Sequence, residues 1–96
     1  MTTLEKIRAQ RNEILAIAHK YGATNLRVFG SVLHGDDRED SDIDILADWE
    51  DWKRGIDKVY IKNELELLTG KKVDFVIAKN LHWYIKDAVI QEAQPI

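Results

Sequence analysis

The segment DIDILAD, residues 42–48, constrains the fold of this chain more than any other stretch. Apolar and other residues alternate along it, which is the pattern of a β-strand with one buried face. Ile43, Ile45 and Ala47 would point to one face of this strand. Asp42, Asp44 and Leu46 would point to the other. The segment therefore predicts a sheet that packs one face against a core and presents carboxylates on the opposite face.

The rest of the chain supplies helices and two further strands for such a sheet. Thr2 and Glu5 fit a capping box at the start of the first helix, and Gly22 fits its stop. Gly70 ends a second long helical segment. The predicted elements are a helix over 3–21, a strand over 24–29, one helical turn over 31–34, a strand over 42–48, a helix over 50–69, a strand over 71–78 and a helix over about 80–92. This order, α-β-(turn)-β-α-β-α, predicts an α/β (α+β) fold with a small mixed sheet backed by helices.

Helical spacing also predicts which side chains face the core. Three tryptophans flank predicted helix starts, where each could either cap the core or lie at an interface. The residues expected to face inward are Ile56, Val59, Tyr60, Asn63, Leu67 and Leu68 in the helix over 50–69, and Leu81, Ile85, Ala88 and Val89 in the last helix; the tryptophans are Trp49, Trp52 and Trp83.

Composition restricts the class of protein. The 96 residues suit one domain, 1–96, and the absence of cysteine excludes disulfides and thiolate metal sites. Residues 36–51 carry a charge of −8 and the remainder carries +5. This segment argues against direct nucleic-acid binding there and is compatible with a divalent metal. No apolar run is long enough to span a membrane, and charges recur through the first 15 residues, so a cytoplasmic protein is expected.

Three aspartates suggest a metal site. Residues two apart in a strand share a face and lie about 6–7 Å apart, so ionised Asp42 and Asp44 would repel each other. A divalent cation would relieve that repulsion, and carboxylate oxygens suit Mg²⁺ or Mn²⁺. Asp74 is the one charged residue inside the apolar run VDFVI and would supply a third carboxylate. Its position mid-strand is difficult to explain by packing.

Gly30 and Ser31 suggest a phosphate site on the same edge. They follow the strand over 24–29 and begin a short helix, whose first N–H groups would be free to bind an anion. Gly30 would let a phosphate approach the backbone, and the Ser31 hydroxyl would add a hydrogen bond. Phosphate and metal sites together indicate a nucleoside triphosphate and phosphoryl or nucleotidyl transfer.

Simpler interpretations exist for each of these residues. Asp42 and Asp44 could be a loop acid and an N-cap, Asp74 could be an edge-strand charge, and Ser31 could be a plain N-cap. The acids over 36–40 are expected to form a solvated loop, from which Arg38 could reach a triphosphate or pair with its neighbours. A P-loop is excluded because Asp36 and Asp37 follow the glycines, and an EF-hand loop starting at residue 36 lacks the required glycine and glutamate.

The motif Gly30-Ser31, ten residues, then Asp42-x-Asp44, resembles the signature of the DNA polymerase beta-like nucleotidyltransferase superfamily. Asp74 stands in the place of the third strand carboxylate of that superfamily. The resemblance covers nearly the whole chain, and the small size is similar to the minimal nucleotidyltransferases (MNT), the antitoxins of HEPN/MNT toxin–antitoxin pairs. One departure is His34, because the residue three after the serine is often arginine in these proteins.

This resemblance implies metal-dependent transfer of AMP from ATP to a tyrosine of a HEPN-domain ribonuclease toxin. Asp42 and Asp44 would hold two Mg²⁺ ions, Asp74 would complete the site and act as general base, and Gly30 and Ser31 would bind the phosphates. Two alternatives stay open. The chain could neutralise its toxin by binding alone, or it could be the catalytic subunit of a small-molecule or nucleic-acid nucleotidyltransferase with a separate helical subunit. Homo- or hetero-oligomers are compatible with each.

Overall fold

The computed structural model describes residues 1–49 and 55–96, without the side chains of residues 55 and 56. Its strands form one sheet in the order β3-β2-β1-β4. β1 pairs antiparallel with β2 and with β4, whereas β2 and β3 are parallel. The predicted mixed α/β architecture is therefore confirmed. The strands are β1 Thr24–Phe29, β2 Ile43–Asp48, β3 Val73–Ile77 and β4 Gln94–Pro95.

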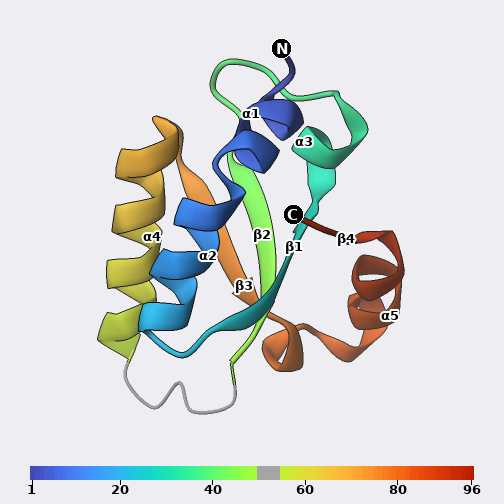
Figure 1. Ribbon diagram of the computed structural model, residues 1–96. Coiled ribbons are helices and arrows are strands. Elements are labelled where there is room, and N and C mark those ends of the chain that lie inside the picture. Colours follow the sequence, from blue (N-terminus) through green and yellow to red (C-terminus); the bar gives the residue numbers. More distant parts are fainter. Residues whose placement is uncertain (50–54) are drawn as a thin grey trace.

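Helices cover the two faces of this sheet unequally (Figure 1). α1, α2 and α4 lie on one side, and α5 lies on the other side, beyond β1. The short helix α3 follows β1 directly, as predicted. None of the described helices combines the length and the apolar character that a membrane crossing requires. The helices are α1 Thr3–Ala9, α2 Arg11–Lys20, α3 Gly30–His34, α4 Gly55–Thr69 and α5 Trp83–Glu92, with a 3₁₀ turn η1 Ala78–Asn80 between β3 and α5.

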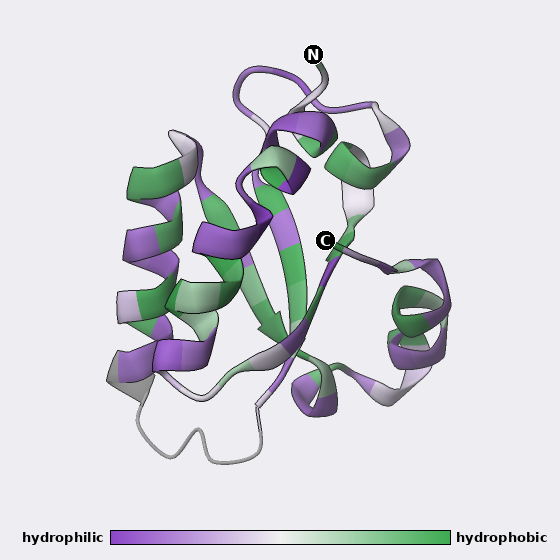
Figure 2. Ribbon diagram, viewed as in Figure 1, coloured by the Kyte–Doolittle hydropathy of each residue, from purple (hydrophilic) through white to green (hydrophobic). Residues whose placement is uncertain are grey.

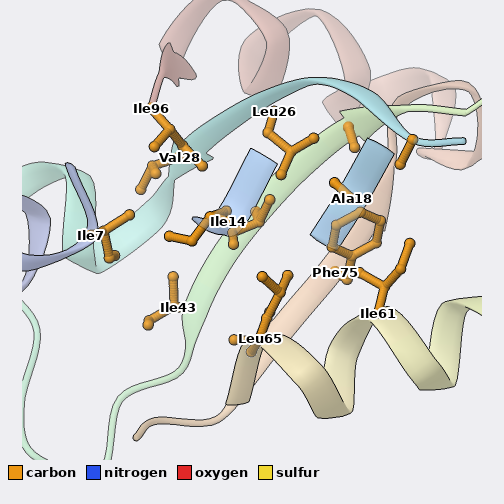
Figure 3. Packing of buried hydrophobic residues seen from close by; sticks show 14 of the residues in the cluster. Ile7, Ile14, Ala18, Leu26, Val28, Ile43, Ile61, Leu65, Phe75 and Ile96 are labelled. Carbon is orange, nitrogen blue, oxygen red and sulfur yellow. The ribbon is translucent and has the colours of Figure 1, made fainter. Parts of the chain in front are cut away.

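The core lies between the sheet and the three helices α1, α2 and α4. β2 contributes Ile43, Ile45 and Ala47 to it, as the alternation in its sequence predicts. The ring of Trp49 packs edge-on against Phe75, with 6.2 Å between ring centroids, so this tryptophan caps the core. Figure 3 shows Ile14, Leu65 and Phe75 meeting in this layer. In Figure 2 the strands β2 and β3 are largely hydrophobic, whereas the helices alternate between hydrophobic and hydrophilic turns.

The first predicted helix is two helices. The capping box of Thr2 and Glu5 is present and Gly22 follows the end with φ +94°, both as predicted. The break falls at Gln10, whose ψ of 16° leaves the helical range. Its side-chain amide donates a 3.1 Å hydrogen bond to the carbonyl of Leu68 in α4. That carbonyl belongs to the last turn of α4, where no intrahelical partner exists, so a tertiary contact accompanies the break.

The predicted inward face of α4 is wrong. Ile61 and Leu65 are fully buried, whereas Val59, Tyr60 and Leu67 are exposed, Leu67 at 86%. The exposed set lies roughly on the opposite side of the helix, at 100° per residue. Both faces of α4 carry apolar side chains, so periodicity alone could not choose between them. Asn63 is also exposed, whereas Leu68 packs against the core as predicted. Residues 50–54, which include Trp52, and the side chain of Ile56 lie outside what the structure describes.

The predicted packing of the last helix is also wrong. α5 has no buried residue: Ile85 and Ala88 are exposed, and Leu81 and Val89 are only partly covered. Trp83 is 84% exposed and does not cap the core. The sheet face on that side presents the carboxylates of Asp44 and Asp74 as well as the buried Leu46, so it is less uniformly apolar than the face that packs against α2 and α4.

The strand β4 was not predicted, because two residues give no periodicity. Gln94 and Pro95 pair with Val28 and Arg27 of β1, and the amide of Ile96 donates to the carbonyl of Leu26 at 3.3 Å. Ile96 is itself buried in the core. This return places α5 beside β1 and brings its last turn near the carboxylate face.

Candidate functional site

The candidate site is a row of residues that crosses three strands on the sheet face opposite the main core. Phe29 of β1 pairs with Asp44 of β2, and Asp44 pairs with Asp74 of β3. The flanking residues Ile43 and Ile45, and Val73 and Phe75, are buried on the other face. Because side chains alternate along a strand, Asp44 and Asp74 project to the same side at the same height. The sequence predicted this juxtaposition, and the parallel register produces it.

Gly30 lies directly against Asp44. Its φ is +73°, and a Cβ built on it would lie 3.1 Å from Cγ of Asp44 and closer still to Oδ2. A side chain at this position would therefore overlap the carboxylate, and the left-handed backbone adds a second reason for glycine. The turn from β1 into α3 thus passes against the carboxylate of β2. A ligand bound at this turn would contact both.

The helix α3 that follows is about one turn long, and backbone hydrogen bonds close its C-terminal end. Gly35, in the left-handed conformation at φ 76°, and Asp36 both donate backbone N–H groups to the carbonyl of Ser31. The Ser31 hydroxyl makes no hydrogen bond with any other residue in the described ranges, and the side chain is half-buried. Val32 anchors the turn in the core. The hydroxyl is consequently available for a ligand next to Gly30.

Asp44 has a strongly perturbed acidity. Burial, and after it the negative charges of Asp74, Asp42 and Glu92 in that order, raise the pKa of its carboxyl to about 6. These three neighbours place four carboxylates within electrostatic reach of one another. Such mutual repulsion marks a position where a cation would be stabilised.

Asp42 and Asp74 differ from Asp44 in their exposure. Asp42 immediately precedes β2 rather than lying within it, and it is exposed. Asp74 is also exposed although it lies inside an apolar strand, because the helices cover only the opposite face of β3. Both side chains are therefore accessible to a ligand that approaches Asp44.

The donor set fits Mg²⁺ or Mn²⁺ in its chemistry, because it consists of hard carboxylate oxygens around a carboxyl group whose ionisation is suppressed. The side chains are not gathered for full coordination. Within residues 1–49 and 55–96, no three His, Asp or Glu groups are placed to ligate a common ion. Mutual repulsion of ionised carboxylates disfavours such convergence unless a cation is present. Substrate oxygens and water commonly supply the remaining ligands of Mg²⁺.

Arg38 stands apart from this row. Its backbone N–H donates to the Ser41 hydroxyl at 2.8 Å, and its carbonyl accepts from Lys71 Nζ at 3.3 Å. The side chain is exposed and forms no salt bridge with the described carboxylates. The structure therefore does not bring Arg38 to Asp44. In the same loop, a 2.6 Å hydrogen bond from Thr3 lowers the pKa of Asp37, which is thus more than a solvated loop acid.

Glu92 is the site residue that sequence reasoning missed. It lies at the end of α5, pairs with His34 Nε2 at the end of α3, and raises the pKa of Asp44. The two partners are 58 positions apart and meet only through the return of the chain along β1. No local pattern in the sequence indicates this pairing. Through this pairing His34 contacts α5 across the site. His34 is the residue that departs from the superfamily pattern.

Comparisons with known proteins identify similar chains. Residues 8–96 match the family model described as nucleotidyltransferase domain. The protein adenylyltransferase MntA of Thermococcus cleftensis is 36% identical over 98 residues, which cover 96% of this chain and 94% of that protein.

Solved structures give the same result at the level of the fold. A structure described as a minimal nucleotidyltransferase superposes with a TM-score of 0.87 and 38% identity, over 100% of this chain and 97% of the other. The structure of a toxin–antitoxin with AMP-PNP matches with a TM-score of 0.74 and 21% identity, over 88% of this chain and 69% of that chain. At that identity the second match concerns the fold alone.

Proposed function

This chain belongs to the nucleotidyltransferase domain family, and from that premise we propose that it is a protein adenylyltransferase: it transfers AMP from ATP to a hydroxyl group of a partner protein. The partner would be a HEPN-domain toxin of the cytoplasm, with a tyrosine as the acceptor and this chain as its antitoxin. The observation that carries the proposal is that Gly30 lies directly against Asp44, which in turn pairs with Asp74 on the neighbouring strand. A nucleotide held at the turn would lie against the carboxylates.

The residues of the chain have separate roles in this reaction. The backbone at Gly30 and the hydroxyl of Ser31 bind the β- and γ-phosphates, which leaves the α-phosphorus over Asp44. Asp74 lies one strand further along the row, on the side from which the acceptor enters, and accepts the proton of its hydroxyl as general base. The raised pKa of Asp44 would return toward its ordinary value when positive charge binds.

Asp42, Asp44 and Asp74 would hold two Mg²⁺ ions. Bound there, Mg²⁺ would neutralise the triphosphate and stabilise the charge that develops on the attacking and leaving oxygens. Arg38 would have to move from its place in the loop to reach the phosphates.

The surface around the site supports a protein partner. α5 lies on the same side of the sheet as the carboxylates, and its Trp83, Tyr84, Ile85 and Ile90 are exposed apolar or aromatic groups. Large aromatic side chains of this kind are enriched where proteins bind one another. A partner that presents a hydroxyl to Asp44 would cover this helix as well.

Mass spectrometry tests the proposal. A HEPN-domain protein that binds this chain is incubated with the chain, ATP and Mg²⁺, and its intact mass is measured. The expected result is a mass increase of one AMP group, located on a tyrosine by peptide fragmentation. An unchanged mass under conditions in which the two proteins bind would contradict the proposal.

One double variant separates catalysis from binding. Asp42→Asn with Asp44→Asn should abolish transfer and toxin neutralisation while the complex still forms. Neutralisation at the wild-type level by this double variant would instead identify an antitoxin that acts by contact. If the chain is instead the catalytic subunit of a small-molecule or nucleic-acid nucleotidyltransferase, its separate helical subunit should not be toxic when expressed alone.

A further inference from the structure

Lys72 immediately precedes β3, and the alternation of that strand, continued back by one residue, would place it on the same face as Asp74. Val73 between them is buried, and the Ile43 amide donates to the Lys72 carbonyl at 2.8 Å, which fixes the parallel register at this point. That register, continued by one residue beyond its first pair of Ile43 with Val73, would set Lys72 beside Asp42 as Asp74 pairs with Asp44. The side chain of Lys72 is exposed.

The neighbouring cavity gives Lys72 access to a ligand. A cavity of about 270 Å³ is lined by Lys72 and Asp42 together with Glu39, Asp40, Ser41, Gly70 and Lys71. Lys72 forms no salt bridge within the described part of the chain. The adjacent Lys71, by contrast, is held by the Asp37 carboxylate at 3.6 Å and by the Arg38 carbonyl at 3.3 Å. Lys72 is therefore the cation of this pair that remains available to a substrate.

The order of the strands assigns a side to each reactant. Phosphoryl groups transfer with the attacking and leaving oxygens roughly in line. The triphosphate cradle at Gly30 belongs to the β1 side of Asp44, so the leaving pyrophosphate departs toward β1. The acceptor must then enter from the opposite side, which is β3. That is the side that carries Lys72 and Asp74.

We propose that Lys72 is a catalytic residue that binds the acceptor oxygen and stabilises the negative charge that develops on it. This inference rests on the proposed adenylyl transfer and adds a residue to it. In the step, the acceptor oxygen forms a bond to the α-phosphorus while the bond from that phosphorus to the pyrophosphate oxygen breaks. The hydroxyl proton passes to Asp74, and Lys72 keeps its protons and supplies the positive charge.

A cysteine variant tests this assignment directly, because the chain has no cysteine of its own. In Lys72→Cys a single thiol can be alkylated with 2-bromoethylamine, which restores an ammonium at nearly the original distance, or with iodoacetamide, which adds a neutral group. Single-turnover transfer to the HEPN-domain protein is measured at saturating ATP, together with ATP affinity by calorimetry and the urea unfolding midpoint. Lys62→Cys, at an exposed position of α4, is the matched control.

The expected loss in Lys72→Cys is on the order of 10²-fold in the transfer rate, since one group that stabilises an oxyanion is removed. Aminoethylation should recover most of the rate and the neutral adduct none, with ATP affinity and unfolding midpoint unchanged throughout. Transfer at the wild-type rate by Lys72→Cys, or equal recovery by both reagents, overturns the role of Lys72. Absence of transfer by the wild-type chain contradicts the proposed function itself.

Discussion

Position 30 cannot carry a side chain without displacing the carboxylate of Asp44, because a Cβ there would lie 3.1 Å from Cγ of Asp44 and nearer still to Oδ2. The turn that begins α3 and the central carboxylate of β2 are in this way one structural unit. A ligand bound at the turn would therefore lie beside Asp44.

Gly30→Ala should therefore differ from Gly35→Ala in a specific way. Both glycines have left-handed φ angles, +73° and +76°, but a Cβ on Gly35 would meet nothing within 4 Å. Each variant should lose about 1–2 kcal/mol of unfolding free energy from backbone strain, measured by urea denaturation. Only Gly30→Ala should also lose AMP transfer, because Asp44 must turn aside. Equal loss of transfer in both variants would show that the close approach is not required.

Asp44→Asn should stabilise the metal-free protein at neutral pH. The folded-state pKa of about 6 lies above the unfolded value, so folding disfavours the ionised form. The free-energy cost of folding with an ionised Asp44 is absent below the unfolded pKa and is fully present above about pH 6. It amounts to at most about 3 kcal/mol, and screening by solvent makes it smaller. Urea unfolding at pH 4 and pH 7.5 measures it. Asp87→Asn, exposed on α5, serves as the control, and a gain that is the same at both pH values would rule out Asp44 as its source.

Asp74→Asn should lower the pKa of Asp44, because Asp74 is the neighbouring charge that raises it most. The titration can be followed through the Asp44 carboxyl carbon by NMR in the absence of metal. The fold should keep its stability, since Asp74 is exposed, while AMP transfer is lost. A large fall in the melting temperature without metal would assign Asp74 to the structure rather than to the site.

Magnesium should stabilise the wild-type chain and not the Asp42→Asn, Asp44→Asn double variant. A ligand that binds only the folded state adds RT ln(1 + [L]/Kd), or about 1.4 kcal/mol when its concentration is tenfold above Kd. Unfolding is compared in MgCl₂ and in KCl at equal ionic strength, which removes general screening. Equal stabilisation of both proteins by Mg²⁺ would place the ion elsewhere.

Glu92→Gln should loosen α5 without much effect on global stability. The His34–Glu92 pair is partly exposed and contributes about 1 kcal/mol or less. Since α5 buries no residue, its attachment depends on this pair and on β4, so amide hydrogen exchange in residues 83–92 should accelerate. Lys20→Gln, which breaks an ion pair with Glu64 on the other side of the sheet, should leave exchange in α5 unchanged. Acceleration by both variants would point to a general loss of stability instead.

Local patterns in the sequence were sufficient for the strands β1, β2 and β3 and for the alignment of Asp44 with Asp74. The alternation around Asp44 and the isolated charge of Asp74 each follow from a period of two, and Gly30 follows from the turn it must form. Patterns failed where the answer depends on a partner distant in the chain. Three features depend on how distant segments pack together: the inward face of α4, the exposure of α5 and the contact of His34 with Glu92.

Lys72 shows a different limit. Its place on the carboxylate face follows from the same period of two that identified Asp74, so the signal was present in the sequence. Its significance depends on the parallel pairing of β2 with β3 and on the engagement of Lys71 by Asp37, neither of which a single strand reveals.

The pairing of Asp44 with Asp74 also bears on how the sheet assembles. A slip of one residue between β2 and β3 would leave an apolar side chain on the open face and drive an aspartate into the core, because the side-chain period is two. That misassembled sheet would bury an unpaired charge, which is far less stable than the native pairing. These carboxylates repel one another when no cation is bound, yet they also exclude the nearest competing register. The residues proposed for the reaction therefore also direct the two strands to their correct alignment during folding.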